Sequence, residues 1–547
     1  MIGFKTKALA GALVISSIGL STTAWAAQSM SNDSERVKKA TTTQPNVKVQ
    51  IDQPAPANAA SGLQFKLTHI AVNTDGLNIS QHALDHITAK YIGHKISMTD
   101  LNTMTRELTT YLRSHGYPAA AAYSPSQRIS NGTLEVNVLR GVYGNITIDN
   151  KSKLQDSIIE RITRSLKSNT NITTAGLESV LYRLNDIGGV KATGLLSPGS
   201  KTGTSDFTLH LEDTKNVRTI LYAENYGTKA AGRYRYGLID DIYNVDHHGE
   251  HLSVNGLISN DHMHNYGASW ELPYGTSGTK AGISLSRTDC ALGGSFRDMD
   301  AVGQSDNISL FASTPLLRTS NRSRLLKYGI DYHRLTDELR TYSYDVKRRS
   351  QGAHIGYEEI AHNAKNVTDY EATVSSGLMT MVSDYAKTNA AYNHADGRFT
   401  KGFFNVNSIQ AFDKHWDLLV KAQGQLASQN LDSSEQFYLG GASGVRAYPQ
   451  GEASGDLGYL TSAELRYHTK LPNLMLSTYY DGGYVRESKD GLSGNTHLRG
   501  WGVGLTYACP DDYFFRFDYA RRIGLGDKLS TDAQSRQRMW FMAGKIW

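Results

Sequence analysis

The chain has 547 residues, 39% of them hydrophobic, and a formal net charge of +5. This length exceeds that of one ordinary domain, and the weak positive charge, without a dense patch of Lys and Arg among aromatic residues, disfavours nucleic-acid binding. The only two cysteines, Cys290 and Cys509, form at most one bridge, which excludes a disulfide framework.

Residues 1–26 are typical of a cleaved secretory signal peptide. Lys5 and Lys7 precede an apolar run over 8–20, and a small-x-small cleavage site lies at 24–26. The alternative, a membrane anchor, is disfavoured because this run of about 13 residues falls short of the ~20 that a spanning helix needs. No later apolar run is long enough either. Export therefore leads to the periplasm, the exterior or an outer-membrane barrel.

The segment that follows, residues 27–62, is polar and poor in apolar residues. Residues 31–40 can form a short helix. Residues 41–62 contain three prolines, which favours an extended linker over a packed element.

Residues 63–142 predict an αβ unit in the order strand, two helices, two strands. Alternating apolar residues over 65–72 indicate the first strand. Ser80 and Thr99 are predicted to cap the two helices, whose apolar residues recur at helical spacing. Two strands are predicted to follow at 120–124 and 133–139.

Residues 143–213 repeat this order. A strand around Ile146 and Ile148 precedes two amphipathic helices, and strands at 190–196 and 206–211 close the unit. The chain therefore contains an internal repeat of about 75 residues.

From residue 214 onward we find no convincing helix, and runs of about 9–12 residues alternate between apolar and polar. Residues 459–467 show the pattern, with tyrosines on one face and Glu464 and Arg466 on the other. Such repeated alternation is typical of a membrane barrel with a wet lumen, and the 31 tyrosines and 51 glycines suit interfaces and tight turns. A soluble β-sandwich would show the same alternation. The C-terminal strand, which ends on Trp547, favours the barrel.

At about 21 residues per strand with its connection, this region holds roughly 16 strands, an even number as bacterial barrels require. Short connections alternate with longer ones, which we assign to the periplasmic and extracellular ends respectively. This layout predicts that Cys290 lies in an outer loop and Cys509 in a periplasmic turn, about 25 Å of apolar band apart, so that they do not bond.

Several motifs together resemble one family. The stretch from Gly440 to Tyr467, GGASGVRAYPQGEASGDLGYLTSAELRY, resembles the VRGY-type lid-loop motif of the POTRA-plus-barrel superfamily of outer-membrane transporters. The stretches at 116–141 and 184–206 resemble the two POTRA domains of two-partner-secretion (TpsB-type) transporters, and those at 224–237, 270–275 and 479–485 resemble the barrel of the same family. The chain is thus similar to a transporter of the haemolysin secretion/activation type.

This resemblance implies an architecture of α+β periplasmic POTRA domains followed by a 16-stranded antiparallel transmembrane β-barrel. The expected segments are a signal peptide (1–26), a plug helix and linker (27–62), a first POTRA domain (63–142), a second POTRA domain (143–213) and the barrel (214–547).

The resemblance also implies a lid loop that reaches into the lumen. Its motif is Val445, Arg446, Ala447 and Tyr448, and Arg446 is expected to pair with Asp481 of the aspartate-glycine motif Asp481, Gly482 and Gly483. A guanidinium and a carboxylate can make a bidentate, charge-assisted pair. The alternative is two unrelated charges on a polar wall. The family's usual glycine after the arginine is Ala447 here, which would be strained if that position needs a positive φ.

The implied function is an outer-membrane pore that recognises a large exoprotein by its N-terminal secretion domain and moves it to the cell surface without ATP. Exposed POTRA strand edges can accept an unfolded peptide as an extra strand. Candidate passenger-binding residues in the two POTRA motifs are Tyr117, Pro125, Gln127, Asn185 and Asp186. We expect a monomer in contact with outer-membrane lipid and no nucleic-acid partner.

We expect no catalytic residues, cofactor or metal. Histidine clusters at 246–251 and 261–264 match no known ligand spacing, and no nucleotide loop or GxSxG motif occurs. The alternative function is insertion of other barrels into the outer membrane. Such assembly factors usually carry more POTRA units than the two that fit here. An outer-membrane protease or lipase would need converging catalytic groups, and none is evident.

Overall fold

The computed structural model describes residues 47–50, 64–129, 131–491, 494–524 and 530–547. The predicted signal peptide and the predicted plug helix at 27–40 lie outside these residues. The chain divides into two compact units, one mainly of residues 44–214 and one mainly of residues 215–547. In the part of the chain that the structure describes, no helix is long and apolar enough to cross a membrane.

The first αβ domain has two helices over a three-stranded sheet in the order β3-β6-β5. The second helix starts two residues earlier than predicted, because Ser97 and not Thr99 is its N-cap. Ser97 and Asp100 form a capping box, and the hydrogen bonds from Ser97 lower the pKa of the Asp100 carboxyl. The elements are β2 (Gln64–Lys66), β3 (His69–Asn73), α3 (Gln81–Thr88), η2 (Ala89–Tyr91), β4 (Lys95–Ser97), α4 (Met98–Ser114), β5 (Ala121–Tyr123) and β6 (Thr133–Leu139).

The single strand predicted over 65–72 is in fact two strands with different partners. β2 pairs antiparallel with β4, whereas β3 pairs parallel with β6. The change of partner falls at Leu67 and Thr68: the Leu67 carbonyl accepts from Gly93 at 2.8 Å, and the Thr68 amide donates to Gly132 at 2.8 Å. The inward face shifts by one residue at this break, from Phe65 and Leu67 before it to Ile70 and Val72 after it, so one continuously alternating strand does not describe this segment.

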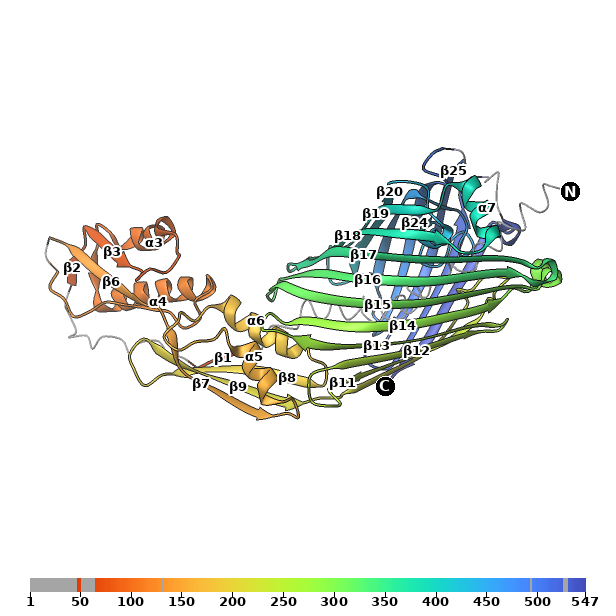
Figure 1. The fold of residues 1–547 in the computed structure, drawn as a ribbon. Coiled ribbons are helices and arrows are strands. Elements are labelled where there is room, and N and C mark those ends of the chain that lie inside the picture. The colour runs from red at the N-terminus through yellow and green to blue at the C-terminus, as the bar shows by residue number, and fades with distance from the viewer. Residues whose placement is uncertain (1–46, 51–63, 130, 492–493, 525–529) are drawn as a thin grey trace. The chain divides into compact units, whose positions relative to one another are not determined.

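The second αβ domain repeats the plan and adds a strand. Its helices cover a sheet in the order β1-β8-β9-β7, in which β1 comes from the segment predicted to be only a linker (Figure 1). The helices place their apolar side chains against the sheet in one buried cluster. The elements are β1 (Val47–Val49), β7 (Val142–Lys151), α5 (Asp156–Thr163), α6 (Thr174–Asn185), β8 (Val190–Pro198) and β9 (Thr204–Asp213).

Sixteen strands of the described residues close into an antiparallel barrel (Figure 1), as predicted. The first strand, β10, pairs with the last, β27, at the seam. The strands are β10 (Val217–Glu224), β11 (Arg235–Tyr243), β12 (His251–Ser259), β13 (Met263–Tyr274), β14 (Thr279–Ala291), β15 (Ala301–Arg318), β16 (Arg322–Leu339), β17 (Tyr344–His362), β18 (Asn366–Met381), β19 (Gly397–Ala411), β20 (Trp416–Ala427), β23 (Leu457–His468), β24 (Leu474–Arg486), β25 (Asn495–Ala508), β26 (Tyr513–Arg522) and β27 (Gln537–Ile546).

The barrel is apolar outside and charged inside. On β24, Tyr480 is 46% exposed whereas the next residue, Asp481, is 1% exposed. Large apolar residues such as Val254, Ile330 and Trp501 are exposed on other strands. A soluble protein would bury them. Because lipid is the solvent that suits an outward apolar face, the pattern identifies a membrane barrel and rules out the soluble sandwich.

Most connections alternate between short and long as predicted, but the β12–β13 connection, residues 260–262, is shorter than the β11–β12 connection, residues 244–250. Cys509 lies in a short turn, and Cys290 lies near the end of β14 and not in the following loop, because β14 extends to Ala291. Both cysteines are free. The expectation of no helix after residue 214 is wrong: α7 (Asp384–Asn393) forms in the connection between β18 and β19, with only Ala386 and Ala390 buried. So narrow an apolar contact leaves little helical periodicity in the sequence.

Candidate functional site

The long connection between β20 and β23, residues 428–456, is hereafter the inward loop. It folds back on itself, since β21 (Phe437–Tyr438) pairs antiparallel with β22 (Ser454–Gly455). Of the lid-loop motif, Val445, Ala447 and Tyr448 are at most 2% exposed. They belong to a buried apolar cluster that joins the loop to the inner wall of the barrel. The members of this cluster are Phe437, Leu439, Val445, Ala447, Tyr448, Leu460, Tyr479, Val485, Leu498 and Ala520. The loop is thus packed inside the barrel.

Arg446 at the tip of this loop meets Asp481 on β24. The Arg446 Nε donates to Asp481 Oδ2 and its Nη2 to Asp481 Oδ1, both at 2.8 Å. The Arg446 backbone amide also donates to Oδ2 at 3.1 Å. The structure therefore brings together the two residues that the sequence analysis paired, in a bidentate arrangement that fixes the guanidinium plane.

The rest of the guanidinium is bound by side chains that the sequence analysis did not assign. Arg446 Nη1 donates to Glu464 at 2.7 Å and to Asp518 at 3.3 Å, and Nη2 donates to Ser462 at 3.2 Å. All five N–H donors of a guanidinium are thereby used. Because Arg446 is only 5% exposed, water contributes little, and this complete set of acceptors is what makes its burial tolerable.

Three further residues complete this cluster, which we call the lumen cluster. Arg516 donates to Asp518 at 2.6 Å, so two guanidiniums face the three carboxylates of Glu464, Asp481 and Asp518. The Tyr479 ring lies with its centroid 3.1 Å from Arg446 Cζ. Trp540 of the last strand donates its indole N–H to the Arg446 carbonyl at 2.7 Å. The only signal in the sequence was that Glu464, Arg516 and Asp518 occupy polar-face positions of their strands.

Ala447, the departure from the family motif, is accommodated by a glycine opposite. Its φ is not among the positive ones, so the alanine carries no left-handed strain. A Cβ added at Gly500 of β25 would lie 2.5 Å from the Ala447 Cβ. Gly500 therefore leaves the space that the Ala447 methyl group fills. In the aspartate-glycine motif, a Cβ at Gly483 would lie 2.6 Å from Leu439, whereas Gly482 has more room.

Gly500→Ala is expected to loosen the tip of the inward loop, because two methyl groups cannot lie 2.5 Å apart. We expect faster cleavage of the loop in limited proteolysis of the detergent-solubilised protein. The double variant Gly500→Ala, Ala447→Gly restores the space and is expected to return to the wild-type rate. Equal cleavage of the single and double variants would contradict this packing.

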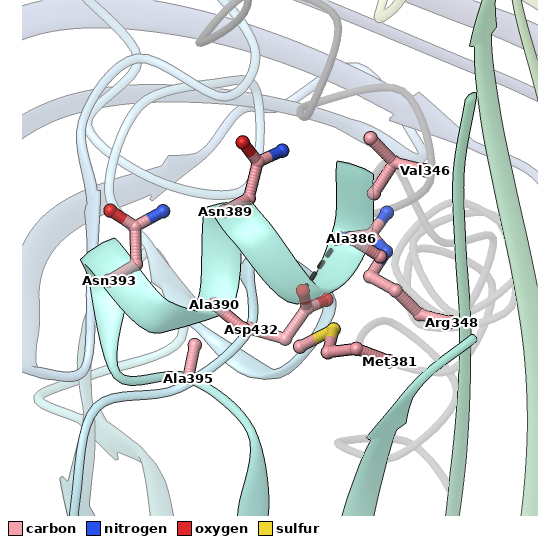
Figure 2. A pocket seen from close by; sticks show the side chains of 9 residues that line it. All are labelled: Val346, Arg348, Met381, Ala386, Asn389, Ala390, Asn393, Ala395 and Asp432. Carbon is pink, nitrogen blue, oxygen red and sulfur yellow. Dashed lines mark hydrogen bonds and ion pairs between the residues drawn. The ribbon is translucent and has the colours of Figure 1, made fainter. Parts of the chain in front are cut away.

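A second buried ion pair holds the base of the inward loop. Arg348 on β17 donates to Asp432 of the loop at 2.6 Å and also pairs with Asp337 on β16. Figure 2 shows Arg348 and Asp432 joined beneath α7. Asp432 additionally accepts from the Ser434 amide and hydroxyl, which fixes the turn that follows. Lys401 on β19 also pairs with Glu435 of the loop at 2.7 Å. The loop is therefore held by charge at several points of the wall.

The cavity beside this pair is small. It is lined by α7, Arg348 and Asp432 (Figure 2) and measures about 30 Å³, which is room for about two water molecules. It cannot hold a small-molecule substrate. In the described residues, no group of three or more His, Cys, Asp or Glu side chains could hold a metal ion.

Two of the candidate passenger-binding residues bind the edges of their own sheets. The Gln127 side chain donates to the Glu135 carbonyl at 2.7 Å and accepts from the Glu135 amide at 2.9 Å. The Asn185 side chain does the same to Ala192, at 3.0 and 2.8 Å. Each amide thus imitates one residue of a neighbouring strand, on β6 in the first domain and on β8 in the second.

The other three candidates lie nearby in the same domains. Tyr117 packs against the first domain's core and accepts from the Asn78 amide at 3.3 Å. Pro125 precedes Gln127, to which its carbonyl is bonded at 3.4 Å. Asp186 ends α6, where its amide donates to Tyr182 at 2.7 Å. Their role toward a passenger stays a prediction.

Comparison with known proteins places the chain in one family. The family model described as "Haemolysin secretion/activation protein ShlB/FhaC/HecB" matches residues 203–507, and a ShlB-type POTRA domain matches residues 65–141. The Heme/hemopexin transporter protein HuxB of Haemophilus influenzae is 27% identical over 490 residues, 86% of each chain. The Outer membrane transporter CdiB of Dickeya dadantii is 23% identical over 475 residues, 82% of each chain.

Solved structures show the same fold. CdiB from Escherichia coli matches with a TM-score of 0.73 at 18% identity, covering 96% of this chain and 97% of that one. Barrel, POTRA domains and inward loop thus occur together in a chain whose family model covers more than half its length. This protein belongs to the haemolysin secretion/activation family, the outer-membrane transporters of two-partner secretion, with its POTRA domains in the periplasm.

Proposed function

We propose that this chain exports one large exoprotein, of the haem- or hemopexin-binding type, through its barrel in an unfolded state and without ATP. The passenger class is suggested by the Heme/hemopexin transporter that is 27% identical over most of both chains. Folding of the passenger outside would prevent its return and so give the direction.

The observation that carries the proposal is the buried attachment of the inward loop. Arg446 uses all five donors inside the lumen, so the loop occupies space that a passenger chain needs. Its attachment is built from ion pairs and hydrogen bonds on several strands, which can be broken and re-formed as a unit. We infer that the lumen cluster is a latch on a loop that must shift during export.

We further propose that the chain is not an enzyme, acts as a monomer in contact with outer-membrane lipid, and has no nucleic-acid partner. The inward charges of the lumen cluster are bonded to one another, which leaves them poorly suited to acid–base catalysis on a substrate.

Deleting the gene for this protein from its native bacterium tests the proposal. We expect mass spectrometry to show that one large exoprotein disappears from the medium and cell surface. The haemin-binding protein that haemin-agarose recovers from these fractions should disappear with it. The outer-membrane proteins should be unchanged. A general loss of barrel proteins with no exoprotein missing would contradict secretion and support barrel assembly instead.

A further inference from the structure

The β8 edge of the second POTRA domain is covered by the chain's own linker. Val47, Lys48 and Val49 of β1 lie opposite Gly194, Leu195 and Leu196 in a parallel register. The Gln50 amide extends the pairing by donating to the Leu196 carbonyl at 2.9 Å. This strand precedes the first POTRA domain in the chain and yet completes the sheet of the second (Figure 1).

The site that β1 fills has defined ends. Since strand residues alternate in the direction of their backbone groups, Ala192, Gly194 and Leu196 face the open side of β8. The Asn185 side chain bonds both backbone groups of Ala192. At the other end, Pro198 has no N–H to offer. The gap between Asn185 and Pro198 therefore fits one short strand, and β1 occupies it.

The site also has a side-chain preference. Val47 packs against the buried cluster of the second domain, whereas Lys48 and Val49 are exposed. An occupant thus needs an apolar residue at the Val47 position. So short a strand, with one side chain partly buried, is held mainly because it is tethered, since a tether raises its effective concentration.

Two other sheet edges offer less. In the first domain, β5 has only three residues and the Gln127 side chain covers β6 beyond it. In the second domain, the opposite edge strand β7 changes register between Tyr143 and Ile146, an irregularity of the kind that discourages strand addition.

We propose that the β8 edge binds an extended segment of the unfolded exoprotein, parallel to β8, and that β1 is a tethered competitor that this segment must displace. The proposal rests on the proposed function and adds the capture site and its regulation. A competitor in cis lowers the apparent affinity for every peptide by the fraction of time the edge is covered. The edge is thereby protected from weakly binding unfolded chains, and only a segment that pairs tightly with β8 displaces β1.

Strand geometry supplies a matched pair of variants. Because the Gln50 amide bonds to β8, the Lys48 amide faces β8 too and the Val49 amide faces away. Lys48→Pro removes a donor and is expected to release β1, whereas Val49→Pro removes none of the pairing donors and should leave β1 in place.

The probe is a fluorescent peptide of the chain's own residues 45–53, PNVKVQIDQ, added to the full mature protein in detergent. By fluorescence anisotropy, we expect Lys48→Pro to bind it at least tenfold tighter than wild type, and Val49→Pro to bind it like wild type. Equal binding by Lys48→Pro and wild type, or an equal gain for both proline variants, would overturn the proposal.

A reversible lock tests the passenger's use of the edge. Paired residues on neighbouring strands lie about 4.8 Å apart, within disulfide reach, so Lys48→Cys with Leu195→Cys can fix β1 on β8. We expect export of the exoprotein to fall at least fivefold and to recover when dithiothreitol is added, whereas Lys48→Cys alone exports normally. Unchanged export by the locked protein would overturn the inference alone. If deletion of the gene removes no exoprotein from the medium or cell surface, the proposed function is wrong. The peptide assay still tests the β8 edge in that case, because it needs no passenger.

Discussion

Arg446→Ala is expected to abolish export of the exoprotein while the barrel stays folded. The substitution removes the cation that faces Glu464, Asp481 and Asp518, and Arg516 stays paired with Glu464 and Asp518. Breaking a buried ion pair by removing one partner costs about 3–5 kcal/mol. The inward loop can avoid that cost by leaving the lumen cluster, where Arg446 makes the ion pairs of the loop tip.

Three measurements on this variant separate the loop from the barrel. Heat-modifiability in gel electrophoresis should be retained, since the sixteen-strand hydrogen-bond network is untouched. Single-channel conductance should rise, and secretion should be lost. Arg446→Lys keeps the charge without the planar fork and is expected to be intermediate. Normal secretion by Arg446→Ala would refute the latch.

Arg348→Met is expected to free the base of the inward loop and leave its tip bound. The guanidinium of Arg348 lies between Asp337 of the wall and Asp432 of the loop, and all three are at most 7% exposed. Without this guanidinium, two buried carboxylates are left without their common cation. This should lower the free energy of unfolding by about 3–5 kcal/mol, as for other buried ion pairs that lose one partner. We expect the single-channel conductance to fluctuate more than in wild type. The heat-induced mobility shift of the barrel in gel electrophoresis should occur at a lower temperature.

Two further variants decide whether the effect comes from this pair. Arg349→Met changes the neighbouring, exposed arginine of the same strand and should behave as wild type. Adding Asp432→Asn to Arg348→Met removes one of the two negative charges that then repel each other, Asp337 and Asp432. The double variant should therefore be more stable than Arg348→Met alone. Additive losses would contradict direct coupling between Arg348 and Asp432.

The pairing of Arg446 with Asp481 followed from motifs, but the rest of the lumen cluster did not. Ser462 and Asp481 face each other on adjacent strands, whereas Asp518 lies on β26, with β25 between it and β24. Which inward charges meet around one guanidinium depends on strand register, and on how far the loop enters. Alternation along one strand carries no information about either.

The edge strand β1 shows the same limit. Three prolines in the linker predicted an extended segment, and the segment is extended where it is described. That it pairs with Gly194–Leu196, far along the chain, depends on β8 having an open edge with Asn185 at one end. No local pattern in the linker indicates such a partner.

The sequence by itself determined the repeated αβ units, the barrel and its even number of strands, because these follow from local periodicity and spacing. The tertiary structure alone decided the change of strand partner at Leu67, the helix α7, the acceptors of Arg446, the second anchor at Arg348 and the cover on β8. Apart from α7, which forms within one connection, each of these is a contact between residues distant in the chain, fixed by how the sheets close and not by the neighbouring residues.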